Sequence, residues 1–438
     1  MPSIQIKSLP ILCLLFLLSG CGTLKIDIDY GGTPSSTDSG STPVMTATVN
    51  AFSTGIPTPE GLPSSGITPP PAPTEALTQP VTEEKVALAA SRNHTCAVLS
   101  GGGVKCWGNN EYGQLGNGTR VNSNVPVNVQ GLTNAKAITA GWGHVCVLTD
   151  TGGVKCWGYN ADGELGNGGT WDQSRPADVA GLSSGVIAID AGDYHTCAVT
   201  ETRSLKCWGK NTYGQLGDWT KTNRNVPVES PFFGGGVADV SAGWGHTCVQ
   251  TTEGWVKCWG NNAYGQMGFG KMTDIHLPAE DVVNLNGRVL EVTADGSQTC
   301  ALTAGGSVQC WGNNRYGQLG DGTILKRYEP VQVKGLTSGV ASIETGWNST
   351  CAVIRGGELQ CWGWNFYGQL GDGTTLNHSA PARVQFLTDG VKRIAVGWGH
   401  SCVVTERDMV KCWGLNGSGQ LGDGTWTDSL VPLTVIGL

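Results

Sequence analysis

Short runs of alternating apolar and polar residues recur along most of the chain and predict β-strands. In one stretch, residues 237–243, 246–250, 256–260 and 278–283 form four such runs. Glycine-containing turn signals separate the first three runs, and a longer polar loop precedes the fourth. Four short strands with turn signals between them predict an antiparallel meander.

The same stretch is repeated seven times between residues 86 and 438. The first cysteine of each copy lies at position 96, 146, 197, 248, 300, 351 or 402, and Trp-Gly follows the second cysteine ten residues later. A period of about 50 residues with strand-like content indicates one supersecondary unit copied along the chain. Seven such sheets arranged radially leave only short, protected edges. The sequence therefore predicts an all-β fold, a seven-bladed β-propeller of four-stranded antiparallel blades. We expect residues 86–91 to pair with residues 431–438 to close the ring.

The first 20 residues predict an export signal. Lys7 precedes an apolar run at residues 11–18, which is too short to span a bilayer. The run ends in Leu-Ser-Gly-Cys at residues 18–21, which resembles the lipobox of bacterial lipoproteins. This resemblance implies cleavage before Cys21 and lipidation of its sulfur. The alternative is an ordinary secretory signal with a chance cysteine. We expect an exported protein that contacts the membrane through a lipid anchor on the cell envelope or cell surface.

Residues 21–85 comprise the predicted lipidated cysteine and a long polar segment. The segment is rich in Pro, Ser, Thr and Gly and has little apolar surface to bury. Such composition predicts a disordered tether, which as a random coil of this length spans roughly 45 Å. The expected organisation is a signal peptide (1–20), a tether (21–85) and a propeller (86–438).

The cysteines of the repeats are predicted to form one disulfide within each blade. A hairpin centred between the two cysteines of a repeat places them opposite each other on neighbouring strands. An even number at fixed spacing in an exported chain is typical of disulfides, whereas zinc sites need closer spacing. The fourteen cysteines are Cys96, Cys106, Cys146, Cys156, Cys197, Cys207, Cys248, Cys258, Cys300, Cys310, Cys351, Cys361, Cys402 and Cys412.

A longer motif supports a family resemblance. Cys-Trp-Gly-x-Asn-x-x-Gly-Gln-Leu-Gly occurs in five repeats, and the other two differ only by Glu164 and Met267. Together with Ala-Gly-x-x-His-Thr-Cys and Pro-Val-x-Val, it resembles the repeat of the regulator of chromosome condensation family over residues 86–438. The resemblance implies a seven-bladed propeller. It does not transfer an activity, because function resides in sites and not in folds.

The founding member of that family is a nuclear guanine-nucleotide exchange factor for a small GTPase. An exported lipoprotein does not meet such a partner, so we do not expect nucleotide exchange. A secreted bacterial inhibitor with this fold binds its target through one propeller face, which is an analogy for an exported binding protein.

One face of the propeller is predicted to carry exposed aromatic side chains. The loops after the first and third strands of an up-and-down blade emerge on the same side. Exposed tryptophans on a rigid platform favour binding of proteins or sugar rings. For the four tryptophans of the first loops, the alternative is structural packing around the channel mouth. The candidate binding face comprises Trp142, Trp171, Tyr194, Trp219, Trp244, Trp347, Trp398 and Trp426.

Two other recurring side chains are predicted to be structural. The tryptophan after each second cysteine occurs in all seven repeats, which favours packing between blades. A histidine two residues before the first cysteine is replaced by Gln298 and Ser349 in two repeats, which favours a hydrogen-bonding role over metal binding. We expect no metal site and no cofactor. The histidines are His94, His144, His195, His246 and His400.

Charge and motif content narrow the function classes. The net charge of −8 lacks the basic footprint of nucleic-acid binders. No catalytic triad, carboxylate pair or phosphate loop is evident, so binding is favoured over catalysis, although a propeller can assemble a site from several blades. We expect a monomeric, membrane-anchored, extracytoplasmic recognition or scaffold module that binds a protein or a glycan.

Two alternatives to a recognition module stay open. One is an enzyme that acts on polysaccharide or cell-wall material with a site at the channel mouth, and the other is a purely structural envelope protein. Clustered acids with perturbed pKa values on the tryptophan face would favour the enzyme, whereas a flat aromatic surface would favour the binding module.

Overall fold

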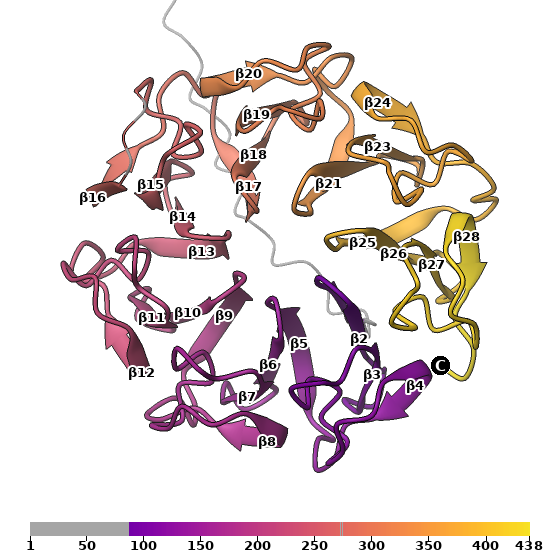
Figure 1. Cartoon of the computed structure of the whole chain (residues 1–438). Coiled ribbons are helices and arrows are strands. Elements are labelled where there is room, and N and C mark those ends of the chain that lie inside the picture. Colours follow the sequence, from indigo (N-terminus) through magenta and orange to yellow (C-terminus); the bar gives the residue numbers. More distant parts are fainter. Residues whose placement is uncertain (1–86, 272, 274) are drawn as a thin grey trace, which may run out of the picture. The chain divides into compact units, whose positions relative to one another are not determined.

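The computed structural model describes residues 87–438 except residues 272 and 274. This part of the chain forms seven four-stranded antiparallel sheets arranged in a ring (Figure 1), which confirms the predicted all-β, seven-bladed propeller. Its regular elements are all strands, so it contains no helix of the length and apolarity that a membrane crossing requires. The predicted signal peptide, Cys21 and the tether lie outside the described residues.

The strands follow one another blade by blade. In the first three blades they are β1 (Ala87–Ala90), β2 (His94–Val98), β3 (Val104–Gly108), β4 (Ser123–Asn128), β5 (Ala135–Ala140), β6 (His144–Thr149), β7 (Val154–Gly158), β8 (Gln173–Asp178), β9 (Val186–Ala191), β10 (His195–Thr200), β11 (Leu205–Gly209) and β12 (Arg224–Glu229). In the last four they are β13 (Val237–Ala242), β14 (His246–Thr251), β15 (Val256–Asn261), β16 (Ile275–Asp281), β17 (Val289–Asp295), β18 (Gln298–Thr303), β19 (Val308–Gly312), β20 (Arg327–Gln332), β21 (Val340–Thr345), β22 (Ser349–Ile354), β23 (Leu359–Gly363), β24 (His378–Arg383), β25 (Val391–Val396), β26 (His400–Thr405), β27 (Val410–Gly414) and β28 (Ser429–Thr434).

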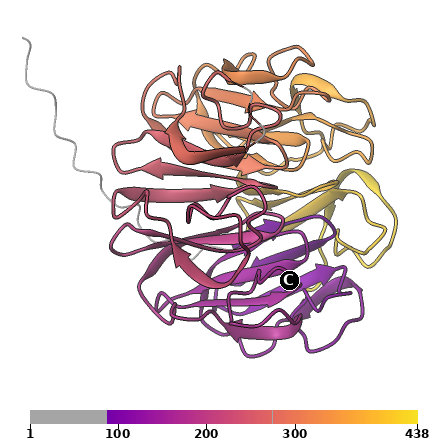
Figure 2. The same cartoon turned by 60° about the vertical axis from the view of Figure 1, so that its left-hand side comes forward.

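Each sheet is built from four consecutive strands, and this arrangement corrects the expected ring closure. β1 pairs with β2, and β28 pairs with β27, so residues 86–91 and 431–438 do not share a sheet. The ring closes instead by packing of the seventh blade against the first, where Trp107 and Val435 belong to one buried cluster. Sheets of neighbouring blades pack face to face around the ring (Figure 2).

The outer strand of the fourth blade differs from its prediction. β16 covers Ile275–Asp281, so it begins and ends earlier than the predicted residues 278–283. Its pairing with β15 shifts register between Cys258 and Gly260, and the other six outer strands pair with a similar shift. Each outer strand also contains a proline. Proline lacks an N–H donor and is accommodated at bulges and sheet edges.

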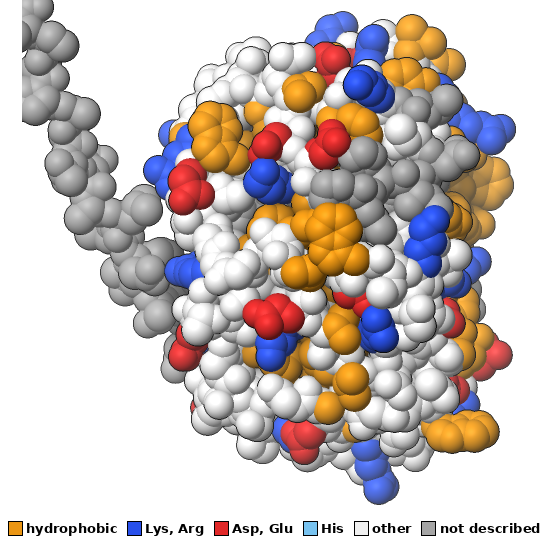
Figure 3. All heavy atoms as spheres, turned by 90° about the vertical axis from the view of Figure 1, so that its left-hand side faces the viewer, with side chains coloured by type: hydrophobic (Ala, Val, Ile, Leu, Met, Phe, Trp, Pro, Cys, Tyr) orange, Lys and Arg blue, Asp and Glu red, His pale blue; other side chains and the backbone are white. Residues whose placement is uncertain are grey.

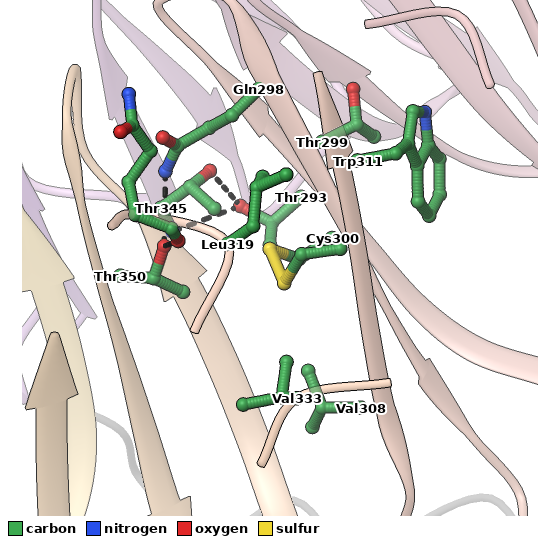
Figure 4. The surroundings of a disulfide bond; sticks show 12 residues. Thr293, Gln298, Thr299, Cys300, Val308, Trp311, Leu319, Val333, Thr345 and Thr350 are labelled. Atoms are coloured by element: carbon green, nitrogen blue, oxygen red, sulfur yellow. Dashed lines mark hydrogen bonds between the residues drawn. A yellow bond between two sulfur atoms is a disulfide. The ribbon is translucent and has the colours of Figure 1, made fainter. Parts of the chain in front are cut away.

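A disulfide joins the second and third strands in every blade, as predicted for all fourteen cysteines. In the fifth blade, Cys300 lies directly opposite Cys310 in the β18–β19 pairing (Figure 4). Each bond closes a loop with a sequence separation of 10 residues. In the chain-entropy model such a loop stabilises the fold by about 2–3 kcal/mol.

The tryptophan after the second cysteine locks each blade to the one before it. Trp311 is fully buried, and its Nε1 donates to the carbonyl oxygen of Gln266 in the preceding blade at 2.8 Å. Thr299 Oγ1 donates to the same oxygen at 2.8 Å. Gly268 approaches this indole so closely that a Cβ would lie 2.6 Å from its Nε1, and its φ is +76°. The indole bond recurs at Trp107, Trp157, Trp208, Trp259, Trp362 and Trp413, which confirms the predicted packing role.

Four of the five recurring histidines, His144, His195, His246 and His400, make a second bond between blades. His246 Nε2 lies 3.0 Å from Thr299 Oγ1 in the next blade. Because that hydroxyl already donates to a carbonyl, the imidazole donates to the hydroxyl. In the fifth blade Gln298 Nε2 donates to Thr350 Oγ1 in the same way (Figure 4). Burial lowers the pKa of all five histidines to about 3, so they are neutral. The structural role predicted for them is confirmed.

Candidate functional site

A cavity of about 360 Å³ opens on the ring axis, where the loops after the first strands meet. Its wall is formed by first-strand residues of all seven blades. Five of the eight residues predicted for the binding face line it together: Trp142, Tyr194, Trp244, Trp347 and Trp398. The rim of the channel is therefore aromatic.

An arginine is held between two of these tryptophans. The guanidinium carbon of Arg92 lies 5.7 Å from the ring centroid of Trp142 and 5.5 Å from that of Trp398. Both distances suit a cation–π interaction. Tyr112 and Tyr194 flank Trp142 on its other sides, with centroids 5.4 and 5.5 Å away. This side of the rim is thus filled by the protein's own cation.

A second hollow of about 510 Å³ adjoins the other side of the rim. It shares Trp244 and Trp347 with the axial cavity, so these two side chains lie between neighbouring hollows. Its remaining lining residues are Tyr264, Ser297, Asn313, Arg315, Tyr316, Ile324, Lys326 and Asn348. The binding surface is therefore hollowed and not flat.

Two acids occupy equivalent places in the cavity wall but differ in their bonding. Asp190 and Glu344 are each the fifth residue of a first strand. The Asp190 carboxylate accepts bonds from Thr139 Oγ1 at 2.8 Å, the Ala242 N–H at 2.8 Å and Ser241 Oγ at 3.4 Å. Within the described residues, the Glu344 carboxylate has neither a hydrogen bond nor an ion pair. Burial and neighbouring carboxyls raise the pKa of Glu344 well above its usual range.

Two further acids line the cavity close to the rim. Burial raises the pKa of Asp193 to about 6, although the Arg92 guanidinium opposes this shift. Burial, followed by the nearby Asp193, raises the pKa of Asp295 well above its usual range. Asp295 stands where Gly243 precedes His246 in the fourth blade, and a Cβ on Gly243 would lie 2.3 Å from that imidazole.

Three other charged residues lie on first strands, two residues before the position that Asp190 and Glu344 occupy in their blades. They are Asp239 on β13, Glu291 on β17 and Arg393 on β25. Burial raises the pKa of Asp239 to about 6 and that of Glu291 to about 7, and it lowers the pKa of Arg393. Sequence reasoning assigned none of these acids to a site. Asp190, Asp239, Glu291, Asp295 and Glu344 lie in strands of mostly small or apolar residues, and Asp193 lies in the loop after a first strand.

Trp171, Trp219 and Trp426 do not line the cavity. Trp171 and Trp426 are 81% and 50% exposed in the loops after their third strands. Trp219 has a φ of +63° at a position where the other six blades have glycine. Its ring lies 4.4 Å from that of Phe232, which belongs to the connection between β12 and β13. The structure thus brings Trp219 to an inter-blade connection and not to the channel mouth.

Large hydrophobic side chains also stand elsewhere on the surface. Trp255, 59% exposed, lies in the hairpin between β14 and β15, which emerges from the other side of the ring. A side view of the propeller, onto its outer circumference, shows hydrophobic side chains scattered among charged ones, several of them along one edge (Figure 3). Trp255 is outside the predicted binding face and provides a matched comparison for it.

Comparisons with known proteins agree with this architecture. The model of the RCC1-like domain matches residues 44–308, and that of the regulator of chromosome condensation (RCC1) repeat matches residues 305–353 and 356–404. The chain belongs to the RCC1-like family. The predicted family resemblance is thereby confirmed.

This RCC1-like chain has relatives of very different lengths. It is 32% identical over 353 residues to the ultraviolet-B receptor UVR8 of Arabidopsis thaliana, covering 79% of this chain and 80% of UVR8. It is 32% identical over 257 residues to the human E3 ubiquitin-protein ligase HERC2, covering 58% of this chain and 5% of HERC2. The second match therefore concerns a small module of a much larger protein.

Solved structures share the fold. Human WBSCR16 matches with a TM-score of 0.67 and 22% identity, covering 74% of this chain and 87% of that chain. Yeast RCC1 (Prp20), in a structure with Kap60, matches with a TM-score of 0.67 and 21% identity over 81% of this chain and 86% of that chain. At these identities the likeness extends to the propeller architecture alone.

Proposed function

We propose that this RCC1-like propeller is a membrane-anchored, extracytoplasmic recognition module that binds a protein partner through the mouth of its channel. The observation that carries the proposal is the pair of neighbouring hollows that share Trp244 and Trp347 as lining residues. Tryptophan, tyrosine and arginine, the residue types around it, dominate binding energy at protein interfaces. Membership of a family of propeller modules supports the same role.

The direct test compares variants on the two sides of the ring. The full-length protein, the Trp244→Ala/Trp347→Ala double variant and the Trp255→Ala control are cross-linked to host envelope proteins, and captured proteins are quantified by mass spectrometry. A captured protein is then purified and titrated directly. We expect the parent and Trp255→Ala to bind it alike and the double variant to bind at least tenfold more weakly. Equal binding by all three folded proteins would refute this face as the binding surface.

Anchoring at Cys21 is the second part of the proposal. A disulfide in each blade suits an oxidising compartment outside the cytosol, and the lipobox-like string at residues 18–21 supports lipidation. Metabolic labelling with a fatty-acid analogue tests it. Label and membrane association should be lost in Cys21→Ser and kept in Cys13→Ser. Persistent labelling of Cys21→Ser would contradict the anchor.

A second candidate function is hydrolysis of a polysaccharide at the channel mouth. The observation that favours it is the cluster of acids beneath the tryptophans, because Asp193 and Asp295 have raised pKa values of the kind that general acids use. Release of reducing ends from host cell-wall polysaccharide by the parent, and its loss in Asp193→Asn and Asp295→Asn, would support this activity. Equal release by both variants would exclude these carboxyls.

A further inference from the structure

We propose that the space between Trp244 and Trp347 receives an arginine side chain of the protein partner, with Glu344 and Asp295 as its counter-charges. This inference rests on the proposed function and specifies the chemistry that the partner presents. It is carried by the arrangement of the rim, by the unequal bonding of two equivalent acids and by the charge of the cavity.

The rim already holds one guanidinium in this manner. The seven rim positions, two residues before each recurring histidine or its replacement, are Arg92, Trp142, Asp193, Trp244, Gly296, Trp347 and Trp398 in blade order. Arg92 lies between the tryptophans of the two neighbouring blades, within 6 Å of both rings. The delocalised guanidinium stacks on aromatic faces more readily than a compact ammonium does.

The rim contains a second pair of tryptophans around a position without a side chain. Gly296 lies between Trp244 and Trp347 in blade order, as Arg92 lies between Trp398 and Trp142. Its carbonyl accepts a hydrogen bond from the Trp244 N–H of the preceding blade at 3.2 Å. A Cβ on Gly296 would lie 2.3 Å from the Trp347 carbonyl oxygen, so the chain cannot supply its own side chain here. Both tryptophans line the axial cavity and also the second hollow.

The cavity has an excess of negative charge beneath this gap. Its wall contains four carboxyls, those of Asp190, Asp193, Asp295 and Glu344, and one cationic side chain, Arg92. Asp190 is satisfied by the three bonds from neighbouring blades. Glu344, at the equivalent position of its blade, faces the cavity while protein surrounds it on its other sides, and its carboxylate lacks a partner in the described chain.

Glu344 is only partly buried, yet a carboxylate that lacks a protein partner in a largely desolvated site is destabilised unless something compensates its charge. Among the described residues, the only hydrogen bond to the Asp295 carboxylate comes from the adjacent Gly296 N–H. A guanidinium that entered between the tryptophans would bring five N–H donors to these oxygens. Asp295 and Glu344 belong to the two blades that carry Gly296 and Trp347, so they are the cavity acids nearest in sequence to this pair of tryptophans.

The geometry favours an organic cation over a metal ion. Across the described residues, no three His, Cys, Asp or Glu side chains converge as metal ligands do. Hard cations such as calcium take six to eight oxygen ligands, whereas two aromatic walls with a few carboxylates suit a flat, weakly hydrated guanidinium.

The test uses the full-length protein and three capped tripeptides, Gly-Arg-Gly, Gly-Lys-Gly and Gly-citrulline-Gly. Binding is followed by tryptophan fluorescence and by calorimetry. We expect the arginine peptide to bind, the lysine peptide to bind more weakly, and the citrulline peptide, which has the shape of arginine without its charge, to show no saturation. Glu344→Gln should weaken arginine binding at least tenfold, and Trp347→Ala should weaken it as well.

Glu358→Gln is the matched control, since it makes the same change in the same blade on the hairpin between β22 and β23. Its arginine affinity should equal that of the parent. Equal affinity for arginine and citrulline, unchanged affinity in folded Glu344→Gln, or no arginine binding at all would each overturn the inference. If a protein partner still binds through Trp244 and Trp347 in that case, the proposed function survives and only the arginine pocket is rejected.

Discussion

Thr95 in the first blade and His400 in the seventh are joined by a 2.8 Å hydrogen bond between Oγ1 and Nε2, although 305 residues separate them. The same pair of side chains joins other neighbouring blades, as at His144 and Thr196. The seventh and first blades are thus joined by the same histidine–threonine hydrogen bond that joins neighbouring blades elsewhere in the ring. Two junctions lack the bond. Between the sixth and seventh blades Ser349 stands where the histidine would be, and its Oγ is buried without a partner among the described atoms. Between the first and second blades Val145 stands where the threonine would be, and His94 Nε2 is likewise left without a partner.

Restoring the hydroxyl should stabilise that junction. In Val145→Thr, the new Oγ1 can accept from His94 Nε2 and donate to the Gln114 carbonyl, which among the described residues accepts only from Trp157 Nε1. A net hydrogen bond is worth about 0.5–1.5 kcal/mol, and we expect the free energy of unfolding to rise by this amount. Urea denaturation measures it. The converse change, Thr196→Val, should lower stability by about 1–3 kcal/mol, because it leaves buried partners unpaired. A less stable Val145→Thr would show that the valine packs in a way the threonine cannot.

Glu164 occupies a position that is glutamine in the other six blades, and it should destabilise the protein at neutral pH. Burial raises its pKa to about 8, and Oε1 has no partner among the described atoms. Because the folded-state pKa exceeds the unfolded value, the cost is absent below about pH 4.5 and grows as pH rises to about 8. Glu164→Gln should therefore stabilise by roughly 1–4 kcal/mol at pH 8 and by almost nothing at pH 4.5. Denaturation curves at the two pH values check this, and equal gains at both would contradict the assigned ionisation.

The buried histidines should make the propeller sensitive to acid. Burial lowers the pKa of His246 to about 3, so its contribution is complete above the unfolded value near 6.5 and is lost as pH falls toward 3. Gln298 makes the equivalent bond without titrating. We expect His246→Gln to match the parent at pH 8 within about 1 kcal/mol and to lose about 2 kcal/mol less than the parent between pH 8 and pH 5. Stability measured from pH 8 to 5 tests this, and parallel curves for the two proteins would rule it out.

The repeated positions were the predictable part of the structure. The two cysteines and the following tryptophan, Trp311 in the fifth blade, recur at fixed spacing in every repeat. One argument about a hairpin or a buried indole therefore applies to all seven blades, and the fold follows from it. The bounds of β16 were less accurate, because the register shift beside Gly260 depends on the pairing and not on alternation. The predicted ring closure was wrong, because no sequence pattern at either end of the propeller indicates whether its first and last strands belong to the same sheet.

The acids of the channel were missed for a different reason. An acid occurs in one repeat at the positions of Asp193 and Asp295 and in two repeats at the position of Glu344, where Asp190 is the other, so periodicity gives these acids little weight. They become neighbours only when the ring closes, which brings positions about 50 residues apart to one cavity. Trp219 was grouped with the other loop tryptophans by its place after the third strand, but it stands at a glycine position and packs on Phe232.

Because no sheet combines the two ends of the propeller, the boundary between the seventh and first blades is one of seven similar joints. A gene rearranged so that translation of the propeller started at another blade, with a short linker between Leu438 and Ala87, would encode the same set of sheets. The order in which blades leave the ribosome is therefore separable from the shape they adopt. Whole repeats, and not strands, are the natural units for recombination in this chain, and a rim residue such as Gly296 can be exchanged together with its blade.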